Sequence, residues 1–237
     1  MAFFINIHRL AFLKASYQNL KQTLTGKDVT LIAVSKTKPV SDILAAYDQG
    51  QRDFGENYVQ EFIEKQPQLP TDIRWHFIGH LQTNKVKYIA PFVHLIHGVD
   101  SDRLLKEINK QGEKLNRRIA CLLQVHISNE ETKFGLDEFE LMNIVHEHLL
   151  STSPALLPWV EVQGLMGMAS FSNDETLIQS EFHQLKKLFD HISALPYLQT
   201  PFTKLSMGMS GDYPLAISCG SNMIRVGSLI FGERNHK

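Results

Sequence analysis

Lys36 is the residue whose type and position most clearly suggest covalent chemistry. It follows the apolar run 30–34 (TLIAV) and continues the alternation of Ile32 and Val34, so its side chain is expected to point to the same side of a strand. Desolvating an ammonium group at the mouth of an apolar core is costly, which favours the neutral, nucleophilic amine. Such an amine can form a Schiff base with an aldehyde. The alternative is a lysine that reaches solvent or pairs with a neighbouring acid, and Lys38 is expected to be solvated in this way.

Two loops rich in Gly and Ser have the composition of a phosphate site. They are 206–212 (SMGMSGD), which contains Ser210, and 226–228 (VGS), which contains Gly227 and Ser228. Glycines let backbone N–H groups approach an anion closely, and serine hydroxyls add further donors.

Arg225 is a charged residue inside an apolar run. It lies between Ile224 and Val226, where an unpaired charge would be costly to bury. One interpretation is a cation that faces a ligand. The other is an arginine paired with an inward-facing acid such as Glu56 or Glu161, and the pattern alone leaves both open.

The elements that must position these residues follow a regular alternation. Eight short β-branched or aromatic runs predict strands at 30–34, 52–56, 74–79, 93–99, 119–127, 160–167, 203–208 and 223–227. Helix-sized segments separate them. Strict alternation in 237 residues predicts an α/β, TIM-like (β/α)8 barrel with an extra N-terminal helix, forming a single domain over residues 1–237. An open doubly wound sheet has the same local pattern and is the alternative.

The helical segments carry apolar faces and start signals. Leu104, Leu105, Ile108 and Leu115 fit one face of a helix, and a second stripe runs over 177–192. Helix starts are predicted at Ser41-Asp42 and near residue 174.

Closure of a barrel would bring the chemically suggestive residues together. The eighth strand of a closed barrel neighbours the first, which places Arg225 near Lys36, and barrels commonly bind phosphate in the loops after strands seven and eight. An amine, two phosphate-binding loops and a cation at one mouth would together suit pyridoxal 5′-phosphate (PLP), a phosphorylated aromatic aldehyde.

Composition and charge exclude several classes of protein. Lys+Arg 24 against Asp+Glu 25 gives a formal net charge of −1, which provides no general attraction to nucleic acid or to anionic membranes. No run approaches the roughly 20 apolar residues of a membrane-spanning helix, and the N-terminus has no signal-peptide layout. We therefore expect a soluble, cytoplasmic protein.

The cysteines and histidines show no pattern of a metal site or a disulfide framework. Cys121 and Cys219 lie in apolar runs and are expected to be free, buried thiols. His94 and His97 are close in sequence, as are His146 and His148, but metal-binding motif spacing is missing, so no metal site is predicted. His76 is expected to be a hydrogen-bonding residue of the core or the mouth.

The sequence resembles the PLP homeostasis proteins (the YggS/PROSC family), barrels similar in fold to the N-terminal domain of alanine racemase. The matching segments are AVSKTKP (33–39), FGENYVQE (54–61), WHFIGHLQTNK (75–85), LSMGMSGDYPLAI (205–217) and GSNMIRVGSLIFGER (220–234). They extend over almost the whole chain. Asn222 departs from the family pattern, where a Thr is common, and this weakens any role of position 222 in phosphate binding.

The resemblance implies a cofactor site on the matching positions. Lys36 would carry PLP as a Schiff base, and Ser210, Gly227 and Ser228 would bind the phosphate. Arg225 would face the pyridine nitrogen, and Asn57 would lie near the phenolic side of the ring. A permanent cation opposite that nitrogen disfavours the pyridinium form, so the ring would be a poorer electron sink.

The resemblance also implies a carrier or regulator of PLP that is not an enzyme and has no catalytic residue. Alanine-racemase-like enzymes recruit an acid/base from a second domain and a partner subunit, whereas this chain ends at Lys237, soon after its last predicted strand. PLP-requiring apoenzymes are the expected partners, and a monomer is expected. The alternatives are a weakly active PLP-dependent amino-acid racemase, an aldolase or isomerase that uses Lys36 on a sugar phosphate, and a scaffold.

Overall fold

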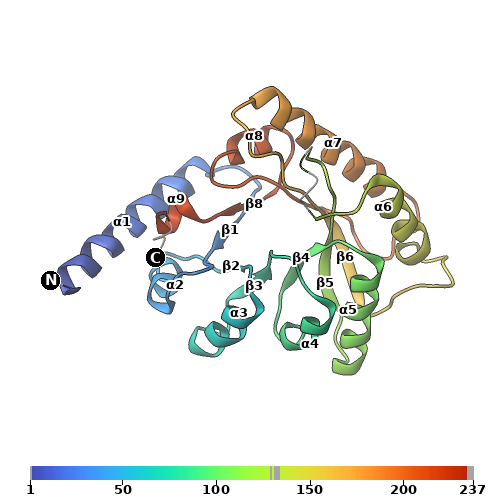
Figure 1. The fold of residues 1–237 in the computed structure, drawn as a ribbon, viewed down its shortest axis with the longest axis horizontal. Coiled ribbons are helices and arrows are strands. Elements are labelled where there is room, and N and C mark those ends of the chain that lie inside the picture. Colours follow the sequence, from blue (N-terminus) through green and yellow to red (C-terminus); the bar gives the residue numbers. More distant parts are fainter. Residues whose placement is uncertain (1, 129, 131–133, 234–237) are drawn as a thin grey trace.

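The predicted strands close into a barrel in a computed structural model of the chain, which describes residues 2–128, 130 and 134–233, and only the backbone of residues 2–12 (Figure 1). Eight strands follow one another around the barrel in chain order, all parallel, and β8 pairs with β1. The predicted (β/α)8 barrel is confirmed, and the alternative prediction of an open doubly wound sheet is wrong.

Each strand lies within or close to its predicted run and is usually shorter. The strands are β1 (Thr30–Val34), β2 (Asp53–Glu56), β3 (Arg74–Phe77), β4 (Leu95–Val99), β5 (Ile119–Gln124), β6 (Val160–Met166), β7 (Lys204–Ser206) and β8 (Met223–Val226). The residues trimmed from the C-terminal ends become the loops at the mouth of the barrel, where barrel proteins place their functional groups.

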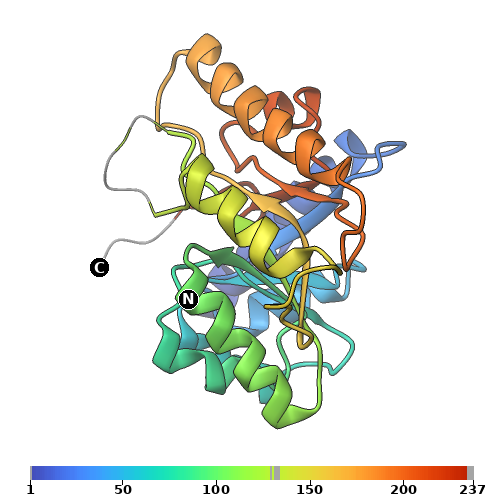
Figure 2. The same cartoon turned by 90° about the vertical axis from the view of Figure 1, so that its right-hand side faces the viewer.

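Helices cover the outside of the strands, as the two views in Figures 1 and 2 show. They are α1 (Ala2–Thr23), α2 (Val40–Tyr47), α3 (Val59–Lys65), α4 (Val86–Ile89), α5 (Asp102–Leu115), α6 (Glu138–Ile144), α7 (Glu175–Ser193), α8 (Tyr213–Ser218) and α9 (Ser228–Phe231). Short 3-10 turns span Gln66–Gln68 and Thr83–Lys85, and a π turn spans Val145–Leu149. The extra N-terminal helix is confirmed, and α1 packs against α2 and α9.

Two details of the predicted helices are corrected. Helix α2 begins at Val40 after Pro39, so Ser41 and Asp42 lie in its first turn rather than before it. Pro39 is the N-cap residue, with an extended backbone and no side-chain hydrogen bond to the first turn. Leu115 is 42% exposed and does not join the buried face of α5, because it is the last residue of the helix, where the chain turns toward β5.

The core has two layers, because side chains of a strand alternate between the inside of the barrel and the helices outside. Most buried apolar residues pack between strands and helices. A small second cluster fills the interior of the barrel and consists of Ile32, Leu95, Leu122, Met166 and Met223. Cys121 and Cys219 are buried and free, as predicted. Among the described helices, none is both long and apolar enough to cross a membrane.

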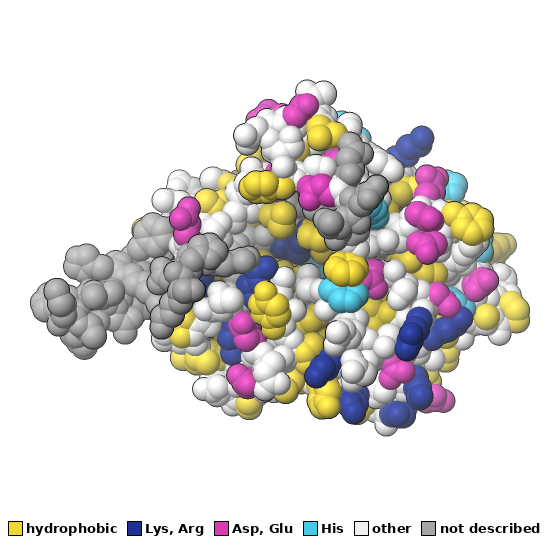
Figure 3. All heavy atoms as spheres, viewed as in Figure 1, with side chains coloured by type: hydrophobic (Ala, Val, Ile, Leu, Met, Phe, Trp, Pro, Cys, Tyr) yellow, Lys and Arg dark blue, Asp and Glu magenta, His cyan; other side chains and the backbone are white. Residues whose placement is uncertain are grey.

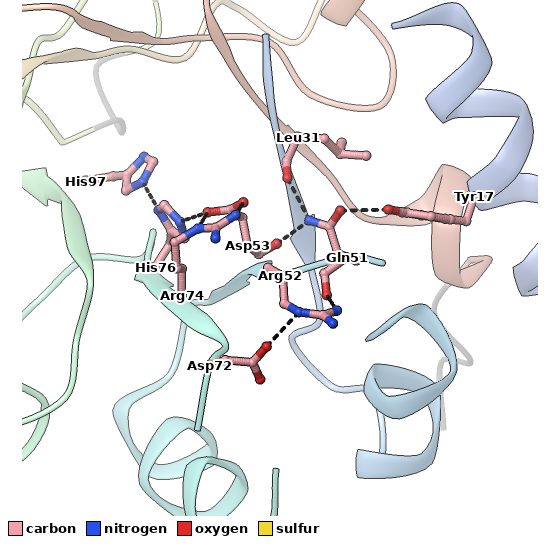
Figure 4. A network of polar contacts seen from close by, with 9 residues as sticks. All are labelled: Tyr17, Leu31, Gln51, Arg52, Asp53, Asp72, Arg74, His76 and His97. Atoms are coloured by element: carbon pink, nitrogen blue, oxygen red, sulfur yellow. Dashed lines mark hydrogen bonds and ion pairs between the residues drawn. The ribbon is translucent and has the colours of Figure 1, made fainter. Parts of the chain in front are cut away.

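The interior also contains buried polar side chains. Asp53 accepts hydrogen bonds from Arg74 and contacts His76 Nε2 at 3.0 Å, and His76 Nδ1 lies 3.0 Å from His97 Nε2 (Figure 4). The prediction that His76 is a hydrogen-bonding core residue is confirmed. In the same region, Gln51 donates to the Leu31 carbonyl and accepts from the Tyr17 hydroxyl, which ties α1 to the barrel.

Burial sets the protonation states in this interior network. Desolvation lowers the pKa of His76 and lowers that of His97 well below its ordinary value. Desolvation alone would raise the pKa of Asp53, but hydrogen bonds from Arg74 and His76 outweigh it and hold that pKa below its usual range. The two rings are therefore neutral and the carboxylate is ionised near neutral pH.

We predict that the free energy of unfolding decreases as pH falls from about 7 to about 5. Below the ordinary histidine pKa of 6.5 the unfolded chain binds protons that the folded chain does not, so acidification favours unfolding by up to about 1.4 kcal/mol per pH unit for each buried ring. Urea unfolding of the wild type and of His97→Gln measures the slope, which should be smaller by about one proton in the variant. His183→Gln, at an exposed position, is the matched control. Equal slopes in all three proteins would contradict the neutral state of His97.

Candidate functional site

A cavity of about 430 Å³ opens at the C-terminal ends of the strands, and all six predicted site residues line it. Lys36 follows β1, Asn57 follows β2, Ser210 lies after β7, Arg225 lies in β8, and Gly227 and Ser228 follow β8. The remaining lining residues are Val34, Lys38, Ile78, Met168, Phe171, Met209, Gly211 and Gly232. On the face drawn in Figure 3, Lys and Arg side chains lie within a recess bordered by hydrophobic side chains.

Lys36 is half-buried and shares the cavity with Val34, as the predicted alternation requires. Its two neighbours in sequence are held from outside the barrel. The Lys65 ammonium of α3 donates to the Ser35 carbonyl at 3.0 Å, and Glu61 accepts from the Thr37 backbone N–H at 2.7 Å. Thr37 has a φ of 64°, a left-handed conformation that costs energy in a β-branched residue. These two hydrogen bonds therefore fix the backbone on both sides of Lys36.

Lys65 also forms an ion pair with a buried acid, Glu56. Lys65 Nζ lies 2.9 Å from Glu56 and 2.7 Å from Glu61, and the Ser35 hydroxyl donates to Glu56 at 2.6 Å. Desolvation raises the pKa of Glu56 despite these partners, whereas at Glu61 the hydrogen bonds from Lys65 and Thr37 outweigh desolvation and lower the pKa. We call Ser35, Thr37, Glu56, Glu61 and Lys65 the Lys65 cluster. It joins the end of β1 to the end of β2 and to α3.

Asn57 presents an unused hydrogen-bonding atom at the cavity. Its side-chain Oδ1 is buried and has no hydrogen-bond partner among the described residues. A buried polar atom without a partner costs free energy, and a ligand that fills the cavity would remove that cost. The loop after β3 passes so close that a Cβ at Gly79 would collide with the Asn57 backbone, so only glycine fits there.

Arg225 is 3% exposed and is held by neutral oxygens. Its Nη1 donates to the Ser206 carbonyl at 2.9 Å and to the Ser206 hydroxyl at 2.7 Å, and its Nη2 donates to the Gly167 carbonyl at 3.0 Å. Burial lowers its pKa to about 10, so it stays charged at neutral pH.

The predicted alternative for Arg225, an ion pair with Glu56 or Glu161, is wrong. Glu56 pairs with Lys65, and Glu161 pairs with Arg118 at 3.2 Å. Within the described part of the chain, the guanidinium forms no ion pair. The guanidinium therefore borders the cavity without a directly paired carboxylate, and the Asp212 carboxylate favours its charged form only through space.

The two Gly- and Ser-rich loops meet at the cavity. The Gly227 backbone N–H donates to the Ser210 hydroxyl at 3.3 Å, which joins the loop after β7 to the loop after β8. Gly208 has a φ of 96°, which glycine adopts without strain, and its carbonyl accepts from the Arg225 N–H at 3.0 Å. Ser228 is exposed at the start of α9.

Two sequence expectations near the cavity have different outcomes. Lys38 is not merely solvated, because its ammonium donates to the carbonyls of Phe231 at 3.0 Å and Gly232 at 3.1 Å and so holds the end of α9. Asn222 accepts from the Leu205 N–H and donates to the Thr203 carbonyl, a role in connecting strands rather than in the cavity.

Together these groups form a cationic, partly apolar cavity with an amine, a guanidinium and Gly/Ser loops. This arrangement can bind an anionic, planar ligand and can attach an aldehyde covalently. In the described part of the chain, no three His, Cys, Asp or Glu side chains are grouped as metal ligands. The sequence analysis did not predict Ile78 and Met168 in the lining, nor the Lys65 cluster. The segment VQEFIEK, which forms α3 and ends at Lys65, carries no pattern that distinguishes a buried lysine from an exposed one.

Comparison with known proteins identifies similar sequences that cover most of the chain. The family model described as alanine racemase, N-terminal domain, matches residues 9–235. The chain is 39% identical over 214 residues to the pyridoxal phosphate homeostasis protein of Pasteurella multocida, with 88% of each chain covered. It is 38% identical over 216 residues to the Homo sapiens protein of that name, with 87% of this chain and 77% of the human protein covered.

A solved structure agrees with these relatives. PipY of Synechococcus elongatus, in its structure with PLP bound, is 35% identical with a TM-score of 0.81, and the match covers 92% of this chain and 99% of PipY. Fold and cavity therefore define a barrel of the alanine racemase N-terminal-domain class. Within that class, the chain belongs to the pyridoxal phosphate homeostasis protein family, which confirms the resemblance seen in the sequence.

We predict that Lys65→Met destabilises the protein by about 3 kcal/mol or more, because it leaves the fully buried Glu56 without its cation. Lys106→Met is the control, since Lys106 forms an exposed ion pair with Asp102, and it should cost less than about 1 kcal/mol. Urea denaturation of both variants measures the difference. Equally small losses would show that the Lys65 cluster does not stabilise the ends of β1 and β2.

Proposed function

We propose that the protein binds PLP at the mouth of the barrel and acts in PLP homeostasis, holding the cofactor without substantial amino-acid turnover. The observation that carries this proposal is the convergence of Lys36, Arg225 and the two Gly- and Ser-rich loops on one cavity. The names of the curated relatives and the PLP-bound structure of PipY support it.

The residues present fit the cofactor. Asn57, whose Oδ1 is buried without a partner among the described residues, and Arg225, which has no ion-pair partner among them, both line the cavity, and a polar aromatic ligand would interact with each. Bound PLP supplies an aldehyde that reacts reversibly with a primary amine and a ring that withdraws electrons. Lys36 would provide the amine, and the Lys65 cluster would keep it in place.

The other site residues have roles toward the phosphate and the ring. Ser210, Gly227 and Ser228 would bind the phosphate, with the Ser210–Gly227 hydrogen bond fixing the spacing of the two loops. Arg225 would face the ring nitrogen and Asn57 the phenolic oxygen. A guanidinium opposite the ring nitrogen keeps a proton away from that atom, which limits the ring as an electron sink. This favours holding PLP over transforming amino acids.

The biological setting is the broader part of the proposal. PLP-requiring apoenzymes are the proposed recipients of the cofactor, and the working form is a monomer in the cytoplasm. The exposed, apolar Phe171 and Met209 at the cavity are suited to contact a recipient protein during transfer. The formal net charge of −1 supports a function without nucleic acid or membrane partners.

We predict that borohydride treatment of the PLP-incubated protein fixes a pyridoxyl group on Lys36, because Lys36 lines the cavity with Arg225, whereas the ammonium of Lys38, the other lysine of the lining, is held by the carbonyls at the end of α9. Peptide mapping by mass spectrometry locates the group. Lys36→Ala should lose it and keep weaker, non-covalent PLP binding through the phosphate loops, whereas Lys187→Ala, on the outside of α7, should behave as the wild type. A colourless, unmodified wild type would refute PLP binding. Complete loss of PLP affinity in Lys36→Ala would contradict the assignment of the phosphate loops.

We also predict that the PLP-loaded protein does not interconvert L- and D-alanine above the level of Lys36→Ala, since Arg225 disfavours the protonated ring. Chiral chromatography after prolonged incubation measures the product. Turnover that depends on Lys36 would favour the alternative, a weakly active racemase.

A further inference from the structure

Five buried side chains from five strands form a continuous hydrogen-bond chain through the barrel interior. They are Asp53 of β2, His76 of β3, His97 of β4, Ser206 of β7 and Arg225 of β8, each no more than 9% exposed. Asp53 Oδ1 to His76 Nε2, His76 Nδ1 to His97 Nε2, and His97 Nδ1 to Ser206 Oγ each measure 3.0 Å, and Ser206 Oγ to Arg225 Nη1 measures 2.7 Å. Figure 4 shows the part from Asp53 to His97.

The residues at the two ends fix the donor-to-acceptor direction of every hydrogen bond in this hydrogen-bond chain. The Asp53 carboxylate only accepts, so His76 donates from Nε2, and its Nδ1 must then accept from His97 Nε2. His97 Nδ1 accepts in turn from the Ser206 hydroxyl, whose oxygen accepts from the Arg225 guanidinium. In each of the four links a donor meets an acceptor with both rings neutral, and both rings carry their hydrogen on Nε2. Hydrogen bonds aligned in this way polarise one another.

From this arrangement we propose that His97 and Ser206 are positioning residues that fix the Arg225 guanidinium toward the ring nitrogen of PLP. The inference rests on the proposed PLP site. A serine hydroxyl rotates freely unless an acceptor fixes its hydrogen, and His97 Nδ1 is that acceptor. With the hydrogen directed to His97, the lone pairs of Ser206 Oγ face Arg225 Nη1.

The hydrogen-bond chain satisfies buried polar atoms and also orients the Arg225 guanidinium. Arg225 forms no ion pair with a carboxylate among the described residues, and Ser206 and Gly167 accept the hydrogen bonds that orient its guanidinium. Of these contacts, only the Ser206 hydroxyl belongs to a side chain. The orientation of the cation at the mouth therefore depends on a histidine that does not line the cavity.

Variants along the chain test this dependence. His97→Leu and Ser206→Ala should each weaken PLP binding by about 3- to 10-fold and shift the absorbance maximum of bound PLP, and the double variant should be no worse than either single one. His97→Asn should restore the wild-type spectrum, because its amide oxygen can accept from Ser206. Leu122→Ala, in the same interior, is the control, expected to destabilise the barrel without shifting the spectrum.

The protein without PLP provides an independent measurement. In ¹⁵N-histidine NMR spectra, His76 and His97 should both be neutral Nε2–H tautomers, and Ser206→Ala should shift the Nδ1 resonance of His97. A charged ring or an Nδ1–H tautomer at His97 would overturn the chain. Normal PLP binding with an unchanged spectrum in His97→Leu would overturn the positioning role alone. A wild type that binds no PLP would overturn the proposed function and, with it, any effect on the ring.

Discussion

The burial of the Arg225 guanidinium among neutral oxygens is the constraint on which the site depends. A buried cation is costly unless hydrogen bonds and nearby acceptors compensate it, and here two carbonyls and one hydroxyl do so. No carboxylate among the described residues removes its charge. Because β8 closes the barrel against β1, with Arg225 paired to Ile32, this charge lies at the mouth that Lys36 also borders. The cavity thus combines a fixed cation with an amine.

Three separate supports hold the mouth in shape. The Lys65 cluster fixes the backbone around Lys36 from outside the barrel, and the Ser210–Gly227 hydrogen bond joins the two Gly- and Ser-rich loops. The hydrogen-bond chain from Asp53 to Arg225 holds the guanidinium from the barrel interior. Each support joins residues from more than one strand, so barrel closure, rather than any local motif, produces the site. A rigid site of this kind suits the retention of a reactive aldehyde.

Features that depend on local sequence pattern could be predicted from the sequence, whereas contacts between residues far apart in the sequence required the structure. Period-two alternation placed Lys36 beside Val34, and β–α alternation predicted the barrel. The contact between His97 and Ser206 joins residues 109 positions apart, and Lys65 reaches Ser35 across 30 positions. Such pairs have no periodic signal in one sequence. The prediction that Lys38 is solvated is wrong for the same reason, because its acceptors at the end of α9 lie near the other end of the sequence.

The ring nitrogen of bound PLP is the atom that a fixed Arg225 guanidinium would face, so its protonation state tests that placement. Loading the protein with PLP labelled with ¹⁵N in the ring and recording its chemical shift near neutral pH measures whether that nitrogen carries a proton. We expect an unprotonated nitrogen, because Arg225 keeps its charge with a pKa of about 10. A pyridinium signal in the wild type would contradict the placement of Arg225 at the ring nitrogen and would favour chemistry on amino acids.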